Sequence, residues 1–348
     1  MDSHFMEFPR AVVVGKGVIK DLGMFLSRLK MPKRVLIISD ELIKKMHGEK
    51  VENALSSEKI EYFWKIVKIA DFATVKEVEK KIIELDVDLV IGMGGGTCID
   101  IAKLSAQSYK KSFISVPTNA AHDGIASPFA SIKDSGKPYS IVSSAPLGVL
   151  ADIDIISSAP ERYMKSGCGD LLAKLTAVKD WQLGRDEKGE YYGEYAANLA
   201  LLSAQVILKN SEQIGKNVVK SVRDVVEALI SAGVAAGIAG SSRPCSGSEH
   251  LFSHALDVIA PNKGLHGEKC GIGTIIISKL YNMNWQEIKE ALTKIGAPTK
   301  LSSIGVTKEE AVEALLLAPN LRERYTILHK NRLSKSEAKD LLDITGVV

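Results

Sequence analysis

The fold of this chain is decided by one stretch, Leu89-Val-Ile-Gly-Met-Gly-Gly-Gly-Thr-Cys-Ile-Asp100. Apolar residues 89–91 predict a buried strand and residues 97–108 predict a helix, with four glycines in positions 92–96 between them. Glycine lets backbone N–H groups approach a ligand closely, and the positive end of a helix dipole attracts an anion. The stretch therefore predicts a pyrophosphate site. A tight turn without a ligand stays open, because Thr97 stands where the common dinucleotide fingerprint has its third glycine.

Length and composition restrict the class of protein. A chain of 348 residues exceeds the usual size of one hydrophobic core and predicts two domains. The chain has 45 basic and 42 acidic residues, so its net charge is small and we expect no nucleic-acid partner. No apolar run is long enough to span a membrane, which argues against membrane insertion. The four cysteines form no Cys-x-x-Cys pair, and the polar first residues are unlike a signal peptide. We expect reduced thiols in a cytoplasmic protein.

The first half of the chain alternates strands with helices. Strands are predicted at residues 11–14, 34–39, 60–67, 89–91 and 113–116. A capping box at Thr74 and Glu77 predicts that one intervening helix begins there and runs to about residue 85. This alternation predicts a parallel sheet with helices on both faces. Residues 128–132, 139–142 and 149–151 predict a hairpin and a strand that returns to the sheet.

After Pro160 the strand signals stop. Helices are predicted at residues 170–183, 196–209, 219–239, 249–259 and 271–282, followed by three that open with capping signals at Asn284 and Glu287, Thr307 and Glu310, and Ser334 and Glu337. The sequence therefore predicts an α/β domain over residues 1–159 and an all-α domain over residues 160–348.

The helical half contains a group of metal-ligand residue types. His250 and His254 are four residues apart and share a helix face, and His266 lies in a glycine-flanked turn before the next apolar helix. Asp170 comes at the start of the apolar helix predicted from residue 170. Histidine nitrogens with one carboxylate suit a catalytic zinc that keeps an open coordination position. The alternatives are an N-cap role for Asp170 and ordinary core or surface roles for the histidines.

Two further polar positions follow predicted strands in the first half. Pro117-Thr-Asn-Ala-Ala-His-Asp-Gly-Ile-Ala-Ser127 follows the strand at 113–116, where ligands of open α/β sheets bind. His122 and Asp123 either line a ligand site there or form an Asx turn. Asp40 follows the strand at 34–39, where its carboxylate either accepts hydrogen bonds from an adenine ribose or caps the helix at 41–46.

With these motifs the chain resembles the archaeal sn-glycerol-1-phosphate dehydrogenases, which belong with glycerol dehydrogenase, iron-dependent alcohol dehydrogenases and 3-dehydroquinate synthase. The resemblance covers nearly the whole chain. Its most distinctive pieces are His122-Asp-Gly-Ile-Ala-Ser-Pro-Phe-Ala-Ser131 and Ser246-Gly-Ser-Glu-His-Leu-Phe-Ser-His254, together with Gly94 to Asp100, Gly169-Asp170 and Leu265-His-Gly-Glu268. It implies a dehydroquinate synthase-like fold: a Rossmann-like NAD(P)-binding domain and a helical domain that binds metal and substrate.

The resemblance also implies roles for individual residues. The zinc ligands would be Asp170, His250 and His266. Substrate contacts would be Asp123, Asp170 and His254, and Asp123 and His254 would be catalytic. The cofactor contacts would be Gly94, Gly95, Gly96, Thr97, Cys98, Ile99, Asp100, Thr118, Asn119, Ala120, Ala121 and Ser127, to which the strand-end argument adds Asp40.

The implied activity is NAD(P)H-dependent reduction of dihydroxyacetone phosphate to sn-glycerol 1-phosphate. One zinc per subunit would polarise the carbonyl, in the first step of archaeal glycerophospholipid backbone synthesis, and we expect a homo-oligomer. The alternatives are a glycerol or other alcohol dehydrogenase, or a dehydroquinate synthase-like lyase. A non-enzymatic metal-binding protein would leave the glycine turn unexplained. Cations near the motifs in sequence, and so candidates for the substrate phosphate, are Lys137, Arg162, Arg243 and Lys269.

Overall fold

The computed structural model describes residues 4–30, 32–134 and 137–348, and it describes no side chains for residues 133–138. The chain divides into two compact units. Unit 1 comprises Met1–Ala120, Gly124–Ser135 and Tyr139–Pro160, and unit 2 comprises Ala121–Asp123, Gly136–Pro138 and Glu161–Val348. The segment Ala121–Asp123 is flanked by unit 1 in sequence, so it carries Asp123 into the helical unit.

Unit 1 is built on a six-stranded sheet in the order β1-β8-β5-β4-β2-β3, and every neighbouring pair is parallel. The strands are β1 Ala11–Gly15, β2 Arg34–Ser39, β3 Glu61–Ile66, β4 Leu89–Gly94, β5 Ser112–Pro117 and β8 Gly148–Asp152. β8 is the predicted returning strand, and it lies between β1 and β5. The preceding hairpin, β6 Phe129–Asp134 and β7 Lys137–Val142, forms a separate two-stranded sheet.

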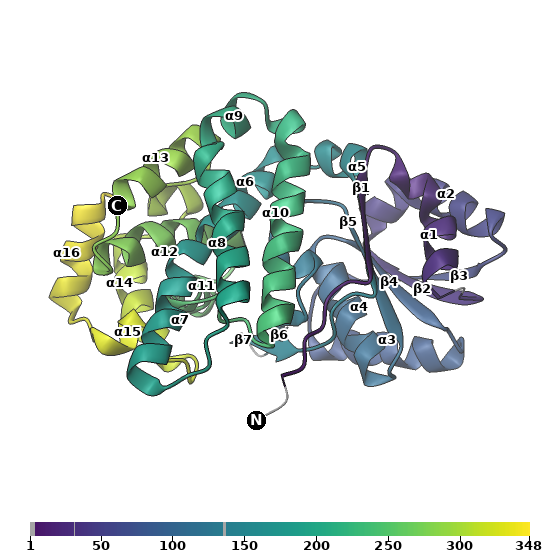
Figure 1. Ribbon diagram of the computed structural model, residues 1–348, viewed down its shortest axis with the longest axis horizontal. Coiled ribbons are helices and arrows are strands. Elements are labelled where there is room, and N and C mark those ends of the chain that lie inside the picture. Colours follow the sequence, from purple (N-terminus) through teal and green to yellow (C-terminus); the bar gives the residue numbers. More distant parts are fainter. Residues whose placement is uncertain (1–3, 31, 135–136) are drawn as a thin grey trace. The chain divides into compact units, whose positions relative to one another are not determined.

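Helices cover both faces of this sheet, as Figure 1 shows. They are α1 Leu22–Leu29, α2 Glu41–Ser57, α3 Phe72–Glu84, α4 Gly96–Ser108 and α5 Ile153–Ser158, with 3-10 turns at Val18–Asp21 and Asp123–Ile125. Alternate strand residues face opposite sides: Val35, Ile37 and Ile91 pack in one core cluster with α1 and α2. On the other side, a Cβ at Gly92 would lie 2.9 Å from Ala102 of α4.

The predicted capping box of α3 is wrong. The helix begins at Phe72, and the side chain of Asp71 caps it by accepting a hydrogen bond of 2.7 Å from the Thr74 N–H. Thr74 is therefore inside the first turn, and the Glu77 carboxylate pairs instead with Lys65 at 2.8 Å. Asp71 offers the same N-cap chemistry three residues earlier, which moves the start of the helix.

Within its described residues, unit 2 consists of helices and their connections. They are α6 Glu161–Leu172, α7 Lys174–Lys188, α8 Glu194–Lys209, α9 Ser211–Lys216, α10 Val218–Ala239, α11 Ser248–Ile259, α12 His266–Leu280, α13 Trp285–Ile295, α14 Lys308–Leu317, α15 Ile327–Lys330 and α16 Lys335–Thr345, with 3-10 turns at Leu301–Ile304 and Ala318–Asn320. The predicted N-caps of α13, α14 and α16 are confirmed at Asn284, Thr307 and Ser334. The predicted fold class, an α/β part followed by an all-α part, is confirmed.

Two predicted helix starts in unit 2 are wrong, and both concern site residues. Asp170 does not start a helix but lies in the last turn of α6, and His266 is the first residue of α12 instead of part of a preceding turn. Glycines misled the prediction, because here they permit close packing of two helices. A Cβ at Gly169 would lie 2.2 Å from the carbonyl oxygen of Gly267, and one at Gly267 would lie 1.9 Å from that of Ser166.

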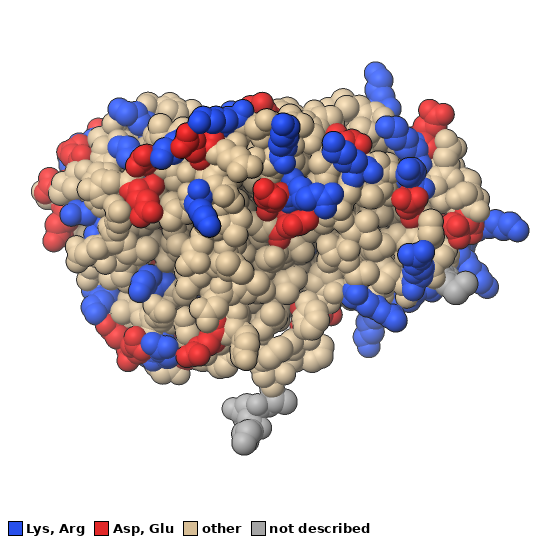
Figure 2. Space-filling model, turned by 45° about the horizontal axis from the view of Figure 1, so that its top comes forward, with Lys and Arg blue, Asp and Glu red and all other residues tan. Residues whose placement is uncertain are grey.

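The surface charge, the hydropathy of the helices and the state of the cysteines agree with what the composition predicts. Figure 2 shows basic and acidic side chains interspersed over the face drawn. Among the described helices, none has the length and hydropathy that a membrane span requires. All four cysteines are free and buried, and burial raises the pKa of the Cys98 thiol to about 12.

Candidate metal centre and nucleotide site

The glycine turn of unit 1 connects β4 to α4. Gly94 has a φ of +157°, and a Cβ there would lie 2.6 Å from the sulfur of Cys98, so a side chain is excluded. Gly95 is the N-cap of α4, and no side chain caps the helix. A Cβ on Gly95 would lie 2.9 Å from Asn119 Nδ2. The first N–H groups of α4 therefore meet the requirements of an anion site: no side-chain cap, and no side chain on the two preceding residues.

Other predicted cofactor residues gather at the same edge of the sheet. The N–H of Thr118, just after β5, donates to the carbonyl oxygen of Gly94 at 3.1 Å. Asp40, just after β2, has its Oδ2 3.7 Å from the Cβ position of Gly94. Adjacent parallel strands end side by side here, where open α/β sheets bind ligands.

Several predicted cofactor residues are held within the protein. Ile99 is fully buried, and Ala120 is also buried. The Asp100 carboxylate accepts from the Ser131 N–H at 3.0 Å, and Ser127 Oγ donates to the Phe129 carbonyl at 3.4 Å. Thr97 and Ala121 are partly exposed, but Ala121 belongs to unit 2.

Asp40 has a defined structural role. Its side chain caps α2, because Oδ1 accepts a hydrogen bond of 2.9 Å from the Ile43 N–H. This is the N-cap alternative that the sequence left open. The cap occupies Oδ1, while Oδ2 lies near the glycine turn, so the ribose contact stays a prediction.

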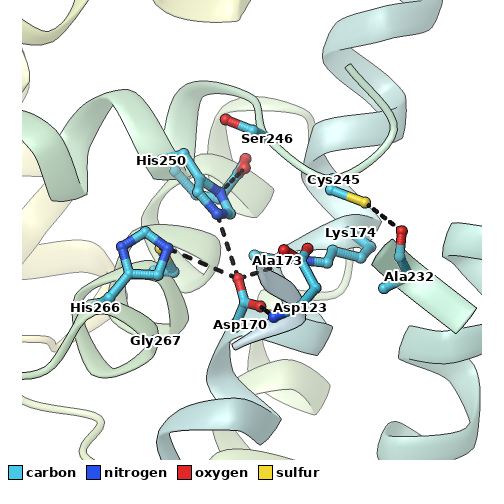
Figure 3. A network of polar contacts seen from close by, with 12 residues as sticks. Asp123, Asp170, Ala173, Lys174, Ala232, Cys245, Ser246, His250, His266 and Gly267 are labelled. Carbon is cyan, nitrogen blue, oxygen red and sulfur yellow. Dashed lines mark hydrogen bonds and ion pairs between the residues drawn. The ribbon is translucent and has the colours of Figure 1, made fainter. Parts of the chain in front are cut away.

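In unit 2, three helices bring together the predicted metal ligands, and Figure 3 shows the two histidine rings directed at the aspartate. Asp170 Oδ1 lies 3.3 Å from His250 Nε2 and 3.9 Å from His266 Nε2. Cys270, one turn after His266 on α12, has its sulfur 3.6 Å from His266 Nε2. One ligand atom from each of these four residues lies within 4.8 Å of all the others.

The surroundings of His250 support the fit of a metal ion. Its Nδ1 lies 2.8 Å from Glu249 Oε1, which leaves Nε2 facing Asp170. Glu249 is fully buried and held by Thr176 Oγ1 and by the Gly247 N–H, each at 2.7 Å. A carboxylate behind a ligating histidine fixes the ring and its tautomer, which is the usual support of a metal site. The sequence analysis quoted Glu249 within its motif but gave it no role.

Lys174 is a site residue that sequence reasoning missed. Its side chain is fully buried and its Nζ lies 3.0 Å from Asp170 Oδ1 and 2.7 Å from Asp123 Oδ2. The Asp123 N–H also donates to Asp170 Oδ2 at 3.0 Å. Burial opposes the charge of Asp170, but Lys174 and His250 outweigh it and hold the pKa of that carboxyl well below its usual range. The available signal was a lysine in the apolar run Leu171-Leu-Ala-Lys174.

His254 lies beside the metal ligands but contacts a different group. Its ring centroid is 6.0 Å from that of His266, and its Nε2 lies 3.1 Å from Arg322 Nη2. Because arginine only donates, Nε2 accepts and Nδ1 carries the proton. Burial and the charge of Arg322 lower the pKa of His254 well below its ordinary value. Nδ1 is buried without a hydrogen-bond partner among the described residues, so its N–H is left unsatisfied.

Comparison with known proteins places this chain in a family. Residues 13–160 match the family described as iron-containing alcohol dehydrogenase. Over its full length the chain is 51% identical to glycerol-1-phosphate dehydrogenase [NAD(P)+] of Nitrosopumilus maritimus, covering 98% of that protein. It is 47% identical to the protein of the same name from Pyrococcus furiosus, over 99% of this chain and all of that one.

The chain belongs to the glycerol-1-phosphate dehydrogenase family. The predicted resemblance is thereby confirmed. Glycerol dehydrogenase from Schizosaccharomyces pombe, a solved structure 20% identical to this chain, aligns with a TM-score of 0.84 over 99% of this chain and 91% of that one. This likeness extends the shared fold to the wider group.

Proposed function

We propose that this chain is an NAD(P)H-dependent glycerol-1-phosphate dehydrogenase that reduces the ketone of dihydroxyacetone phosphate to sn-glycerol 1-phosphate. The proposal rests on the full-length identity to enzymes of that name, combined with the convergence of Asp170, His250 and His266 on one point. In this proposal unit 1 binds the nucleotide and unit 2 binds metal and substrate. The protein would serve glycerophospholipid backbone synthesis in the cytoplasm, as a homo-oligomer.

Asp170, His250 and His266 would hold one zinc ion per subunit. When bound there, zinc supplies a Lewis acid for the carbonyl oxygen of the substrate. The protein's own part is to orient the ligands: Glu249 fixes the His250 ring, and Lys174 holds the Asp170 carboxylate. Cys270 is one turn from His266 and would stay a neighbour of the site, because three protein ligands leave the open position that catalysis needs.

The nicotinamide cofactor supplies the hydride. Its pyrophosphate would bind the N–H groups at the start of α4, in the turn formed by Gly94, Gly95 and Gly96, with backbone contacts from residues 97–100 and 118–121. Asp40 would accept a hydrogen bond from the adenine ribose, and Ser127 would complete the cofactor contacts. Most of these side chains are buried or already bonded, so their proposed contribution is backbone geometry.

Asp123 and His254 would contact the substrate. His254 offers its Nδ1–H to a substrate oxygen, because Arg322 occupies the other ring nitrogen. The Asp123 carboxylate is paired with Lys174, which places a proton-bearing group and its acceptor next to the metal ligand Asp170. His254 would donate a hydrogen bond to the alcohol oxygen as it forms, and the proton that this oxygen takes up would come from the Lys174 ammonium by way of the Asp123 carboxylate.

A substrate panel tests the proposal. The purified, zinc-loaded protein is mixed with NADH or NADPH, and absorbance of the reduced nicotinamide is followed with dihydroxyacetone phosphate and with dihydroxyacetone; glycerol is tested with NAD⁺ or NADP⁺. We expect fast oxidation with dihydroxyacetone phosphate and much slower oxidation with dihydroxyacetone. Preference for dihydroxyacetone and glycerol would favour a glycerol dehydrogenase. No net nicotinamide change with any of them would contradict the proposal and leave the lyase alternative.

A further inference from the structure

Three of the four cations that lie near the motifs in sequence are engaged elsewhere. Within the described part of the chain, each is paired with a carboxylate: Arg162 with Glu268 at 2.6 Å, Lys269 with Asp257 at 2.8 Å, and Arg243 with Glu190. The side chain of Lys137 lies outside the described residues. A cation whose donors and charge are satisfied by a carboxylate is a poor partner for a second anion.

Arg322 differs from these cations. It lies in the connection between α14 and α15, and its side chain is partly exposed. Its recorded partner is neutral, since Nη2 donates to His254 Nε2 at 3.1 Å. Burial alone lowers the pKa of Arg322, and no carboxylate of the described residues raises it. Among the described residues Arg322 is therefore not paired with a carboxylate, and it lies next to a proposed substrate contact.

The surroundings of Arg322 add space and further positive charge. Arg322 and Arg324 both line a pocket of about 400 Å³ formed by residues 319–325 and His329, in which the carboxylate of Glu323 offsets one of the two arginine charges. Arg324 donates to the Ser246 carbonyl and, at 2.6 Å, to Ser242 Oγ, so its donors are used but its charge is not neutralised by these partners. Burial chiefly, with the nearby Arg243 and Arg322, lowers the pKa of Arg324 to about 10, while Glu249 and Asp180 act in the opposite direction.

We propose that Arg322 binds the phosphate group of the substrate, an inference that rests on the proposed function. The guanidinium has five N–H donors in a planar fork that matches phosphate oxygens, and one N–H suffices for His254. Since Arg322 touches His254, an anion bound to the remaining donors lies beside the residue that contacts the rest of the substrate. Arg322 would thus set the preference for a phosphorylated ketone over an unphosphorylated one.

The test compares Arg322→Ala and Arg322→Lys with the wild type and with Arg332→Ala. Arg332 is an exposed arginine after α15 that contacts only Asn320 Oδ1, at 3.4 Å, among recorded partners. For each protein, kcat/KM is measured with dihydroxyacetone phosphate and with dihydroxyacetone, and bound zinc is measured. We expect Arg322→Ala to lower kcat/KM for dihydroxyacetone phosphate by about 10- to 100-fold. The loss with dihydroxyacetone should be clearly smaller, limited to the effect of removing the hydrogen-bond donor to His254 Nε2, and zinc content should stay near wild type. Arg322→Lys should fall between, and Arg332→Ala should match wild type.

Two results would overturn the assignment. An equal loss with both substrates would mean that Arg322 acts by positioning His254, and no loss with either would mean that the phosphate binds elsewhere. Calorimetric titration with inorganic phosphate separates this inference from the proposed function, because it needs no turnover. A wild type that reduces neither ketone would contradict the proposed function. In that case, if the wild type binds phosphate and Arg322→Ala does not, the phosphate site at Arg322 is still supported. If both proteins bind phosphate equally, the assignment of the site to Arg322 is wrong.

Discussion

At the scale of single residues, the candidate metal centre places the two histidines of one helix against different partners. His250 and His254 share α11, yet His250 Nε2 faces Asp170 and His254 Nε2 faces Arg322. The helical spacing that made them equivalent in sequence does not determine which ring faces Asp170. Their substitutions should therefore give different defects.

His250→Ala should lose zinc, and His254→Ala should keep it while losing activity. Removing one of three ligands leaves a weak, misoriented site. Removing the His254 hydrogen-bond donor should lower kcat/KM by about 10²- to 10⁴-fold. Zinc analysis of the purified variants, combined with steady-state kinetics, distinguishes the two, and His266→Ala and Asp170→Ala should behave like His250→Ala. If His254→Ala lacks zinc instead, the site uses three histidines and the proposed substrate role of His254 is wrong.

Asp40 combines a helix cap with a charge near the glycine turn, and two substitutions separate these effects. Asp40→Asn keeps a good N-cap but removes the charge, whereas Asp40→Ala removes both. A carboxylate at a partly exposed site repels a ribose 2′-phosphate by about 1 kcal/mol, or several-fold in affinity. Both variants should therefore lower KM for NADPH several-fold with little change in kcat. Only Asp40→Ala should also lower the free energy of unfolding, by about 1 kcal/mol. An unchanged NADPH to NADH ratio in both would leave Asp40 as a cap only.

At the scale of elements, the contact between α6 and α12 determines the geometry of the metal centre. Asp170 lies in the last turn of α6 and His266 in the first turn of α12, next to the close approach of Gly169 and Gly267. Backbone meets backbone there, so no flexible side chain can move aside.

Gly169→Ala should separate the two helices and weaken metal binding. Its Cβ would lie 2.2 Å from the Gly267 carbonyl oxygen, and the resulting overpacking should cost about 1–3 kcal/mol of stability. The matched control is Gly48→Ala inside α2, where a Cβ meets only Lys44 Cγ at 3.5 Å and more distant atoms. That control should stabilise the protein by up to about 1 kcal/mol. Thermal unfolding and zinc titration of both variants check this, and normal zinc affinity in Gly169→Ala would contradict the account.

At the scale of the whole molecule, metal binding should contribute to stability, because the ligands come from three helices that the unfolded chain does not hold together. At zinc concentrations about 100-fold above Kd, binding should add about 2.7 kcal/mol to the free energy of unfolding. Stripping the metal with a chelator should therefore lower Tm. Falling pH should reduce the same contribution, because protonated histidines do not bind zinc.

Scanning calorimetry with and without chelator, at several pH values, measures this contribution. The His250→Ala variant is the control, since its Tm should not respond to zinc. A wild-type Tm that is independent of zinc would mean that Asp170, His250 and His266 do not hold a metal in solution.

Sequence by itself determined the parts of this protein that depend on local physics. Hydrophobic period and turn residues predicted the strand–turn–helix around Gly94, the parallel sheet and the N-caps at Thr307 and Ser334, because each depends on neighbouring residues. The proposed metal ligands were predictable as residue types with suitable spacing. The resemblance assigned them roles, and the structure then brought them together.

Only the tertiary structure decided how these parts combine. The pairing of His254 with Arg322 spans 68 positions, and the ion pair of Arg162 with Glu268 spans 106. No local pattern in the sequence shows which cation is paired with a distant carboxylate. The sequence therefore could not show which cation is left to bind the substrate phosphate. The start of α12 at His266 and the end of α6 after Asp170 were missed for the same reason. Glycine usually breaks a helix, but here it lets two helices touch, and that contact exists only once the chain is folded.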